Sequence, residues 1–238
     1  MEIAMKRLPE SEIYERGLSY WPYRTSLQAV LEKVVNSTPA KASLLDVMCG
    51  PGYLLGQIAK KRSDLTLHGI DIDKRYVQYG RKKYPDITFE KGDVLKLQPG
   101  CRFDVVVCTG SLHHLPYNRQ EDGVVAIASM VKPDGFVIIS DCYVDDYNDE
   151  TERKVAAAKL GYEYLKETIE NGAPDPVVEW TADILWNDVL MHEFKTSVAK
   201  RLPMLQKHFA AVMTSKKWPA ERSDGYGDYI HTCAGTKH

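Results

Sequence analysis

Apolar runs of strand length alternate with helical stripes along most of the chain. The runs expected to form strands lie at 44–47, 65–70, 87–90, 103–108 and in a segment that ends at Asp141. Apolar residues recur at helical steps over 53–61, 74–84 and 119–131. Strands that alternate with helices usually pair in parallel and carry helices on both faces of the sheet. The pattern therefore predicts an α/β fold with a doubly wound, Rossmann-like sheet.

The first 38 residues precede this sheet and combine a helical stripe with a group of aromatic residues. The stripe extends from Arg24 to Asn36. The aromatic residues that precede it or begin it are Tyr14, Tyr20, Trp21 and Tyr23. Two interpretations remain open: the aromatic side chains pack the helix onto the sheet, or the segment 1–38 folds over the carboxyl edge of the sheet as a lid.

Residues 145–195 are predicted to form a helical insertion after the fifth strand. Apolar residues of its first helix recur at three- and four-residue steps, at Val155, Ala158, Tyr162, Leu165 and Ile169. A second helical run extends from Trp180 to Leu190. The pair is consistent with a cover over a substrate site and also with a packing or dimerisation surface. The remaining segments, 39–144 and 196–238, are assigned to one Rossmann-like domain that ends in a helix over 197–209 and strands over 211–214 and 228–234.

Acidic residues and glycines gather where the predicted strands end. Asp46 lies in the first strand, and the glycine-containing loop 50–52 follows it. Asp71 ends the second strand at about the 20-residue distance at which dinucleotide-binding folds place an acidic residue on the ribose. Asp93 follows the third strand, and Leu55 replaces the third glycine of the nicotinamide fingerprint. Several carboxylates favour a neutral or cationic ligand over a pyrophosphate.

Five motifs resemble, in order and spacing, those of the class I S-adenosylmethionine-dependent methyltransferases. They cover roughly residues 40–143 and are Asp46–Gly52, Gly69–Ile72, Gly92–Val94, Phe103–Val107 with Leu112–Leu115, and Val131–Ile139. One such motif is a common accident, whereas five in register are a strong signal. The resemblance implies a seven-stranded sheet whose last strand is antiparallel, and S-adenosylmethionine as the cofactor.

The resemblance also implies roles for residues of the first two motifs. It places Asp46 near the methionine amino group, and Gly50 and Gly52 against the methionine moiety. It places Asp71 on the ribose diol, with Ile72 next to it.

The later motifs would bind the base and border the reacting methyl group. By the same resemblance, Asp93 meets the adenine amino group, and the backbone N–H of Val94 lies on the ring. Thr109 and Gly110 border the methyl donor. Met48 departs from the family, which usually has Gly or Ala there, so we expect a bulkier wall beside the cofactor.

The candidate catalytic residues are His113, His114, Asp141 and Tyr20. Methyl transfer from a sulfonium mainly requires alignment, and a base is needed only for an unionised hydroxyl or a protonated amine. A histidine of the pair 113–114 suits that role, although a structural role in hydrogen-bonding the loop explains the pair better. Asp141 can orient an amine or hydroxyl, and Tyr20 can shield the sulfonium or face a flat acceptor. The other histidines show no ligand spacing, so no metal site is expected.

Composition narrows the class of protein. The formal net charge is −2, and the basic clusters close predicted helices, which disfavours nucleic acid as a partner. No apolar run of membrane-spanning length and no signal peptide is found, so we expect no membrane association. The 5 cysteines form no C-x-x-C pair, which favours a reducing cytoplasm.

Missing motifs narrow the methyl acceptor. The fourth strand is followed by Thr109–Ser111 rather than by the Pro-Pro-aromatic motif of amino-methylating enzymes, and no pyrimidine C5 nucleophile motif is present. We therefore expect a methyltransferase that acts on an O, N or C atom of a small molecule. Three alternatives remain: a nucleic-acid or protein methyltransferase, a non-catalytic module that binds S-adenosylmethionine, and a nicotinamide-dependent oxidoreductase.

Overall fold

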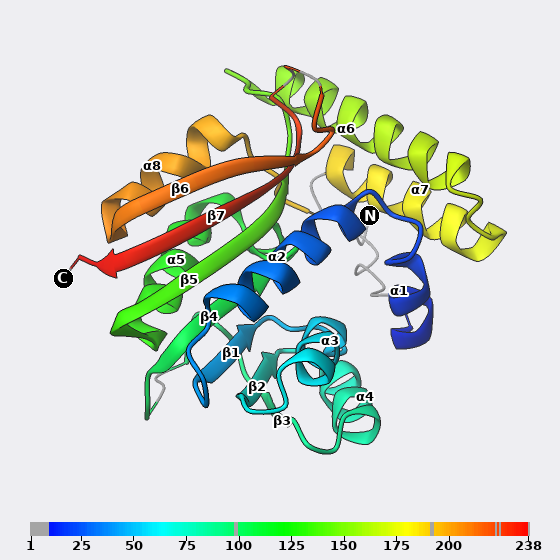
Figure 1. Ribbon diagram of the computed structural model, residues 1–238. Helices are drawn as coiled ribbons and strands as arrows, with labels where there is room; N and C mark the ends of the chain where they lie inside the picture. The colour runs from blue at the N-terminus through cyan, green and yellow to red at the C-terminus, as the bar shows by residue number, and fades with distance from the viewer. Residues whose placement is uncertain (1–9, 98–99, 191–192, 222, 224, 238) are drawn as a thin grey trace.

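The fold is described by a computed structural model that covers residues 10–97, 100–190, 193–221, 223 and 225–237. Within these residues, seven strands form one sheet in the order β3-β2-β1-β4-β5-β7-β6 (Figure 1). The strands are β1 Ser43–Val47, β2 Thr66–Asp71, β3 Thr88–Lys91, β4 Phe103–Thr109, β5 Val131–Tyr143, β6 Phe209–Trp218 and β7 Gly227–Thr236. Strands β1 to β5 pair in parallel, and β7 is antiparallel to β5 and β6. The predicted fold class is confirmed, including the antiparallel last strand.

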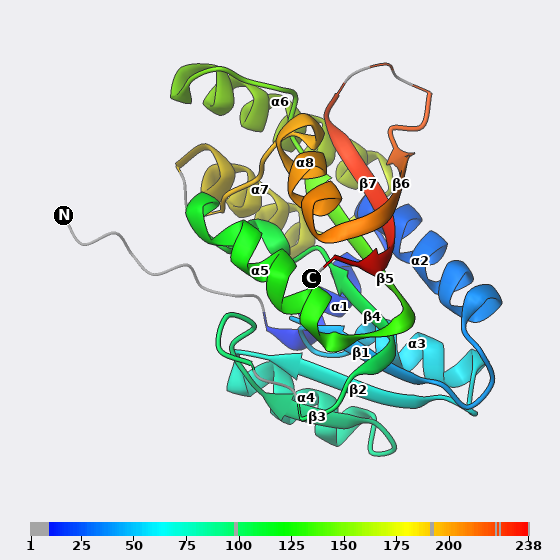
Figure 2. The ribbon, with the colours of Figure 1, turned by 90° about the vertical axis from the view of Figure 1, so that its left-hand side faces the viewer.

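Helices cover both faces of the sheet, as the alternating pattern predicts. Three of them pack on one face: α2 Tyr23–Ser37, α3 Tyr53–Lys61 and α4 Lys74–Lys83. The opposite face is covered by α5 Tyr117–Met130 and α8 Val198–His208 (Figure 2). The strand residues between these layers are almost fully buried, among them Leu44, Leu45, Val106 and Val107. The sheet is therefore a rigid platform whose carboxyl edge remains available for a site.

The carboxyl edge of the sheet is covered by segments from both ends of the chain. They are α1 Ser11–Gly17 and the helices α6 Glu150–Glu170 and α7 Asp175–Leu190 (Figure 1). A third apolar cluster joins them, and it includes Trp21 from the N-terminal arm and Tyr164 from α6. Trp21 Nε1 donates to Thr181 Oγ1 of α7 at 2.8 Å, and Asn171 Nδ2 donates to the Tyr20 carbonyl at 2.7 Å. The arm and the helical insertion are thus fastened to each other.

The apolar stripe read from the first insertion helix faces outward. Val155, Tyr162 and Ile169 of α6 are 65%, 62% and 54% exposed. The buried face instead carries a mixture of small, polar and larger apolar residues, listed here in chain order: Arg153, Ala156, Ala157, Leu160, Gly161, Tyr164 and Thr168. The apolar stripe is therefore not the face of α6 that packs in this structure. Small residues let α7 approach closely, and a helix face lined by them carries a weak hydrophobic signal in sequence.

The closest approach of the two insertion helices is at Gly161. A Cβ atom at this position would collide with the Leu185 side chain of α7. Arg153, itself 1% exposed, donates to the carbonyls of Asp188 and Val189 at the end of α7. These contacts fix α7 against α6. Among the described residues, no helix is both long and apolar enough to span a membrane.

Candidate functional site

A cavity of about 490 Å³ lies at the carboxyl ends of β1, β2, β4 and β5. Its walls come from the turns after these strands, from the N-terminal arm and from α6 and α7. The predicted site residues that line it are Asp46, Met48, Gly50, Asp71, Ile72, Asp93, Val94, Thr109, Gly110, His113 and His114. Residues that are far apart in sequence therefore meet in one chamber.

The turn after β1 adopts an unusual backbone. Met48 has φ = +59°, a left-handed conformation that costs a side-chain-bearing residue about 1–2 kcal/mol. This conformation explains why a glycine suits the position, and the Met48 side chain packs against the core beneath the sheet edge. Ser111 Oγ donates to the Met48 carbonyl at 3.0 Å and holds the turn. The bulkier side chain is accommodated, because the cavity next to it remains open.

Asp46 is a buried carboxyl group at the cavity wall. It is 1% exposed, and its Oδ1 has no hydrogen-bond partner among the described residues. Burial raises the pKa of Asp46 well above its usual range, and the nearby charge of Asp71 adds to the effect. A buried carboxylate without a donor is costly for the protein alone, so the site is suited to a ligand that brings a positive charge.

Asp71 links the second strand to the first turn. Its Oδ2 accepts from the Gly50 N–H at 2.8 Å, and its Oδ1 accepts from the Asp73 N–H at 2.8 Å. Burial raises the pKa of this carboxyl, although the two backbone donors act in the opposite direction. The donors fix the carboxylate plane, and each oxygen keeps a lone pair for a hydroxyl ligand. Ile72 beside it is 60% exposed and forms an apolar rim of the cavity.

Asp93 and Val94 lie after β3 on the same side of the cavity. Asp93 Oδ1 accepts from the Leu95 N–H at 3.0 Å, and its Oδ2 lies 3.3 Å from Lys96 Nζ. Val94 is buried. Across the cavity, the arm supplies Tyr14, whose pKa is raised above the usual tyrosine range by burial and by the charge of Asp46. In the sequence, Tyr14 stands out only as one member of an aromatic group.

Three predicted site residues are not among those that line the cavity. Gly52 begins α3 with φ = +87°, and a Cβ there would meet the Phe89 ring, so it permits helix–strand packing rather than contact with a ligand. Tyr20 is half-buried beside the arm, and its neighbour Trp21 lines the cavity instead. Asp141 lies behind His113. The expected contacts of these three residues with a ligand therefore stay predictions.

The two histidines follow β4 in a short 3₁₀ turn, Leu112–His114. His113 Nδ1 lies 2.5 Å from Asp141 Oδ1, and both side chains are buried. The His114 side chain is 37% exposed, compared with 7% for His113. The two rings lie 4.3 Å apart, so both reach the same corner of the cavity. Asp141 therefore contacts His113 and is not among the residues that line the cavity.

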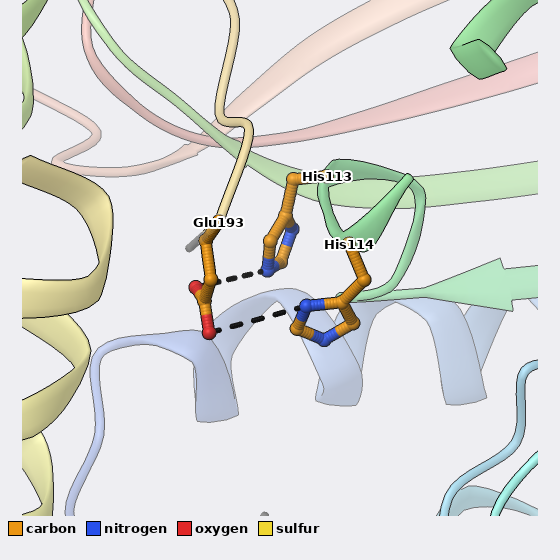
Figure 3. A group of neighbouring side chains, drawn as sticks. All are labelled: His113, His114 and Glu193. Carbon is orange, nitrogen blue, oxygen red and sulfur yellow. Dashed lines mark ion pairs between the residues drawn. The ribbon is translucent and has the colours of Figure 1, made fainter. Parts of the chain in front are cut away.

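Glu193 completes this corner and was not found by sequence analysis. Its carboxylate points toward both rings, with Oε2 at 3.5 Å from His113 Nε2 and Oε1 at 3.9 Å from His114 Nδ1 (Figure 3). Lys195 Nζ lies 2.7 Å from Glu193 Oε2 and 2.7 Å from Asp188 Oδ1. Phe194 N donates to the His113 carbonyl at 2.7 Å and anchors the segment. In the sequence, Glu193 simply follows the second helical run of the insertion and belongs to no recognisable motif. Only the fold shows that it lies beside the two histidines.

The other end of the chamber is apolar. Trp180, Ile184 and Leu185 of α7 line it together with Tyr164 of α6 and Trp21 of the arm. An apolar wall with a few convergent polar groups is typical of small-molecule sites, whose volumes run from about 300 to 1,000 Å³. The arrangement thus combines a polar binding turn, an acid–base corner and an apolar wall.

Residues 44–135 match the family model described as a methyltransferase domain. Over 136 residues the chain is 29% identical to dTDP-3-amino-3,6-dideoxy-alpha-D-glucopyranose N,N-dimethyltransferase of Streptomyces fradiae, covering 54% of this chain and 51% of the relative. It is 25% identical over 186 residues to malonyl-[acyl-carrier protein] O-methyltransferase of Halalkalibacterium halodurans, covering 71% of this chain and 64% of the relative. The chain therefore spans only about half to two thirds of the length of these relatives.

A solved structure supports the fold over nearly the whole chain. Magnesium protoporphyrin IX methyltransferase from Synechocystis PCC 6803, solved with bound S-adenosylhomocysteine, superposes with a TM-score of 0.59. The match covers 91% of this chain and 84% of that protein at 18% sequence identity. At this identity the similarity concerns the fold alone.

Proposed function

We propose that this chain is a class I S-adenosylmethionine-dependent methyltransferase that transfers the methyl group of S-adenosylmethionine to an oxygen, nitrogen or carbon nucleophile of a small molecule. The observation that carries this proposal is the single chamber that joins the cofactor motifs to the helical insertion. In that chamber the polar turns after β1, β2 and β3 face one end, and α7 faces the other.

The cofactor would lie along the turns that end the strands. Asp46 supports binding of the cationic methionine amino group, since its buried oxygen has no donor among the described residues. Asp71 supports binding of the ribose hydroxyls, and Asp93 with Val94 supports binding of the adenine ring. Bound there, S-adenosylmethionine supplies an activated methyl group, and Thr109 and Gly110 border its sulfonium end.

The residues of this chain contribute mainly position and exclusion of water. Holding a nucleophile in line with the donor methyl group can supply roughly 7–11 kcal/mol of the barrier. The arm and insertion close the chamber around the reactants, which supports such alignment. His113 and His114 are placed to accept a proton from a hydroxyl or ammonium acceptor, and Asp141 holds the His113 ring in orientation.

The shape of the chamber supports a small acceptor with an apolar body. The wall that α7 contributes includes Trp180, Ile184 and Leu185, which suit an apolar or aromatic skeleton. The net charge of −2 and the covered chamber argue against a nucleic-acid chain or a folded protein as acceptor. One relative is named as an N,N-dimethyltransferase of an amino sugar nucleotide and another as an O-methyltransferase of malonyl-[acyl-carrier protein], which supports a nitrogen or an oxygen as the acceptor atom.

Calorimetric titration of the purified chain with S-adenosylmethionine, S-adenosylhomocysteine and NADH tests the first part of this proposal. We expect binding of both sulfur nucleosides and none of NADH. A chain that binds neither sulfur nucleoside would refute the proposal. A chain that binds them then enters a radiolabelled methyl-transfer screen with small phenols, carboxylic acids and amines, in which failure across all classes would favour the non-catalytic alternative.

A homodimer through α6 is part of the proposal. Val155, Tyr162 and Ile169 form an exposed stripe at seven-residue intervals, and a second copy of the same helix is complementary to it. Light scattering after size exclusion should show a dimer that Tyr162→Lys converts to a monomer. A monomeric wild-type chain would exclude this interface.

We also propose that the protein works in a reducing cytoplasm. All 5 of its cysteines are free, and 3 of them, Cys108, Cys142 and Cys233, are buried. The protein should lose activity during prolonged exposure to air unless a reductant is present. Equal activity with and without the reductant would contradict this proposal.

A further inference from the structure

We infer that His113, His114 and Glu193 bind one divalent transition-metal ion in the corner of the chamber. One ligand atom from each side chain lies within 4.8 Å of the others (Figure 3). Two imidazole nitrogens and one carboxylate form the facial set found in non-haem iron sites, and the same donors suit Zn²⁺, Co²⁺ and Mn²⁺. The inference concerns binding of the ion, and with the ion bound the coordinated nitrogens of His113 and His114 cannot also accept a proton from the acceptor.

The three ligand atoms lie within 4.8 Å of one another and must move closer together to close around an ion. Ligand bonds of about 2.0–2.2 Å place neighbouring ligand atoms roughly 3–3.5 Å apart. His113 Nε2 already lies 3.5 Å from Glu193 Oε2, and His114 Nδ1 lies 3.9 Å from Glu193 Oε1. The His114 side chain is 37% exposed and can rotate more freely than its neighbour. Rotation of the His114 and Glu193 side chains would be the movement that brings the three ligand atoms to coordination distance.

Asp141 orients the His113 ring in the way that carboxylates commonly orient metal-binding histidines. Its Oδ1 lies 2.5 Å from His113 Nδ1, and the carboxylate is 1% exposed. When His113 Nδ1–H donates to this carboxylate, Nε2 presents its lone pair toward Glu193. Carboxylate–histidine pairs of this kind fix the tautomer and the ring direction at metal sites. Asp141, which does not line the chamber, would thus orient one ligand of the ion.

The charge balance of the corner favours a cation. The carboxylates of Asp141, Asp188 and Glu193 are all buried, and Lys195 Nζ bridges the latter two. Arg201 is the second buried cation close enough to act on Asp141. Carboxylates therefore outnumber these two cations, and burial of excess negative charge is costly unless a cation compensates it.

The competing occupant of the corner is a proton. Protonated on both nitrogens, His113 would lie as an imidazolium between Asp141 and Glu193 and would account for the same distances. Lys195 already holds Glu193 Oε2, so the ion would bind through Oε1. These two occupants predict opposite results in a metal titration.

The positions of the ion that are not filled by protein face the chamber. If the proposed methyl transfer holds, an oxygen or nitrogen of the acceptor fills one of them and is thereby directed toward the methyl donor. The class of acceptor would then be a molecule that carries a metal-binding hydroxyl, carboxylate or amine. This last step rests on the proposed function, whereas binding of the ion does not.

Titration of the metal-free full chain with Co²⁺, followed by visible absorption and calorimetry in the absence of cofactor and acceptor, tests the inference. We expect one equivalent of Co²⁺ to bind with micromolar or tighter affinity and to produce a d–d band of a low-coordinate nitrogen–oxygen site. His114→Ala and Glu193→Gln should each weaken binding about tenfold or more, and Asp141→Asn about 10- to 100-fold. Circular dichroism shows whether each variant is folded.

A surface pair of the same residue types gives the matched control. His208 Nε2 lies 3.0 Å from Glu121 Oε1, far from the chamber in the α5–α8 layer. His208→Gln should leave Co²⁺ binding unchanged. Absence of the d–d band in the wild type would favour the proton and overturn the inference, as would loss of binding in His208→Gln with retention in His114→Ala and Glu193→Gln. Because cofactor titration is read separately, failure of the proposed function would leave this result unaffected.

Discussion

Binding of S-adenosylmethionine should be coupled to the ionisation of Asp46. The carboxyl is 1% exposed, and burial raises its pKa well above the usual range, with a further contribution from the charge of Asp71. The ammonium group of the cofactor binds the ionised form. Whenever the pH lies below the raised pKa, binding must release a proton, so affinity rises with pH and then levels off.

The expected changes in cofactor affinity follow from the release of one proton and the formation of one charge-assisted hydrogen bond. Release of one proton makes the association constant rise up to about tenfold for each pH unit below the pKa of the free protein. Asp46→Asn removes the charge and should cost about 1.5–3 kcal/mol of binding energy, or roughly 10- to 150-fold in affinity. In the variant the dependence on pH should disappear.

Stability provides an independent check on the same residue. A carboxyl whose pKa is higher in the folded than in the unfolded protein destabilises the fold as pH rises through that interval, since the folded state then holds more protons. Asp46 is in this situation. The ligand-free Asp46→Asn variant should therefore unfold at a temperature at least as high as the wild type at neutral pH, so weak binding cannot be ascribed to misfolding.

Calorimetry at a series of pH values around neutrality, repeated in buffers with different ionisation enthalpies, measures both the affinity and the released proton. 5′-Methylthioadenosine, which lacks the amino-acid part, is the matched ligand and should show no proton release. Equal affinities of wild type and Asp46→Asn at every pH would refute the reasoning. Proton release with 5′-methylthioadenosine would assign the titration to another group.

Three further predictions test other parts of the molecule. Asp71→Ala should weaken cofactor binding by more than about tenfold, about 1.4 kcal/mol for lost ribose hydrogen bonds, and unchanged affinity in calorimetry would place the ribose elsewhere. Gly161→Ala should lower the free energy of unfolding in urea by about 1–3 kcal/mol, because the new methyl group overpacks against Leu185, and it should spare cofactor binding. An unaltered urea midpoint would contradict the close helix contact. Burial lowers the pKa of His231 to about 4 from 6.5, so the unfolded protein takes up a proton at a higher pH than the folded protein. The free energy of unfolding of the wild type should therefore fall by about 3 kcal/mol as the pH is lowered from 6.5 to 4. His231→Gln should flatten this part of the profile, and parallel profiles of the two proteins would show that another group is responsible.

The architecture could be predicted because local signals agree with one another. Glycine and acidic residues mark the ends of strands, and the helix predicted over 53–61 has those bounds in the structure. The orientation of α6 was not predictable in the same way. Its apolar residues Tyr162 and Ile169 face outward, since the buried face uses small residues that give little hydrophobic signal. Which face packs is decided by the fit to α7, a tertiary property.

The site was predictable only where residues follow a strand of the common core. Asp46, Asp71 and His113 lie at strand ends, and the sheet brings them to one edge. Glu193 lies about 80 residues after the histidines and reaches them through the path of the chain around α6 and α7. No spacing rule connects such residues. The same holds for Trp21, whose partner Thr181 is 160 residues away.

The hydrogen bond between Trp21 and Thr181 has a consequence for the order of events during turnover. Tyr14 of the arm lines one part of the chamber and α7 lines another, so the hydrogen bond links the two segments that cover the chamber. If the chain transfers methyl groups as proposed, spent cofactor and methylated product would then leave during the same opening, because the arm and α7 would move away from the chamber together.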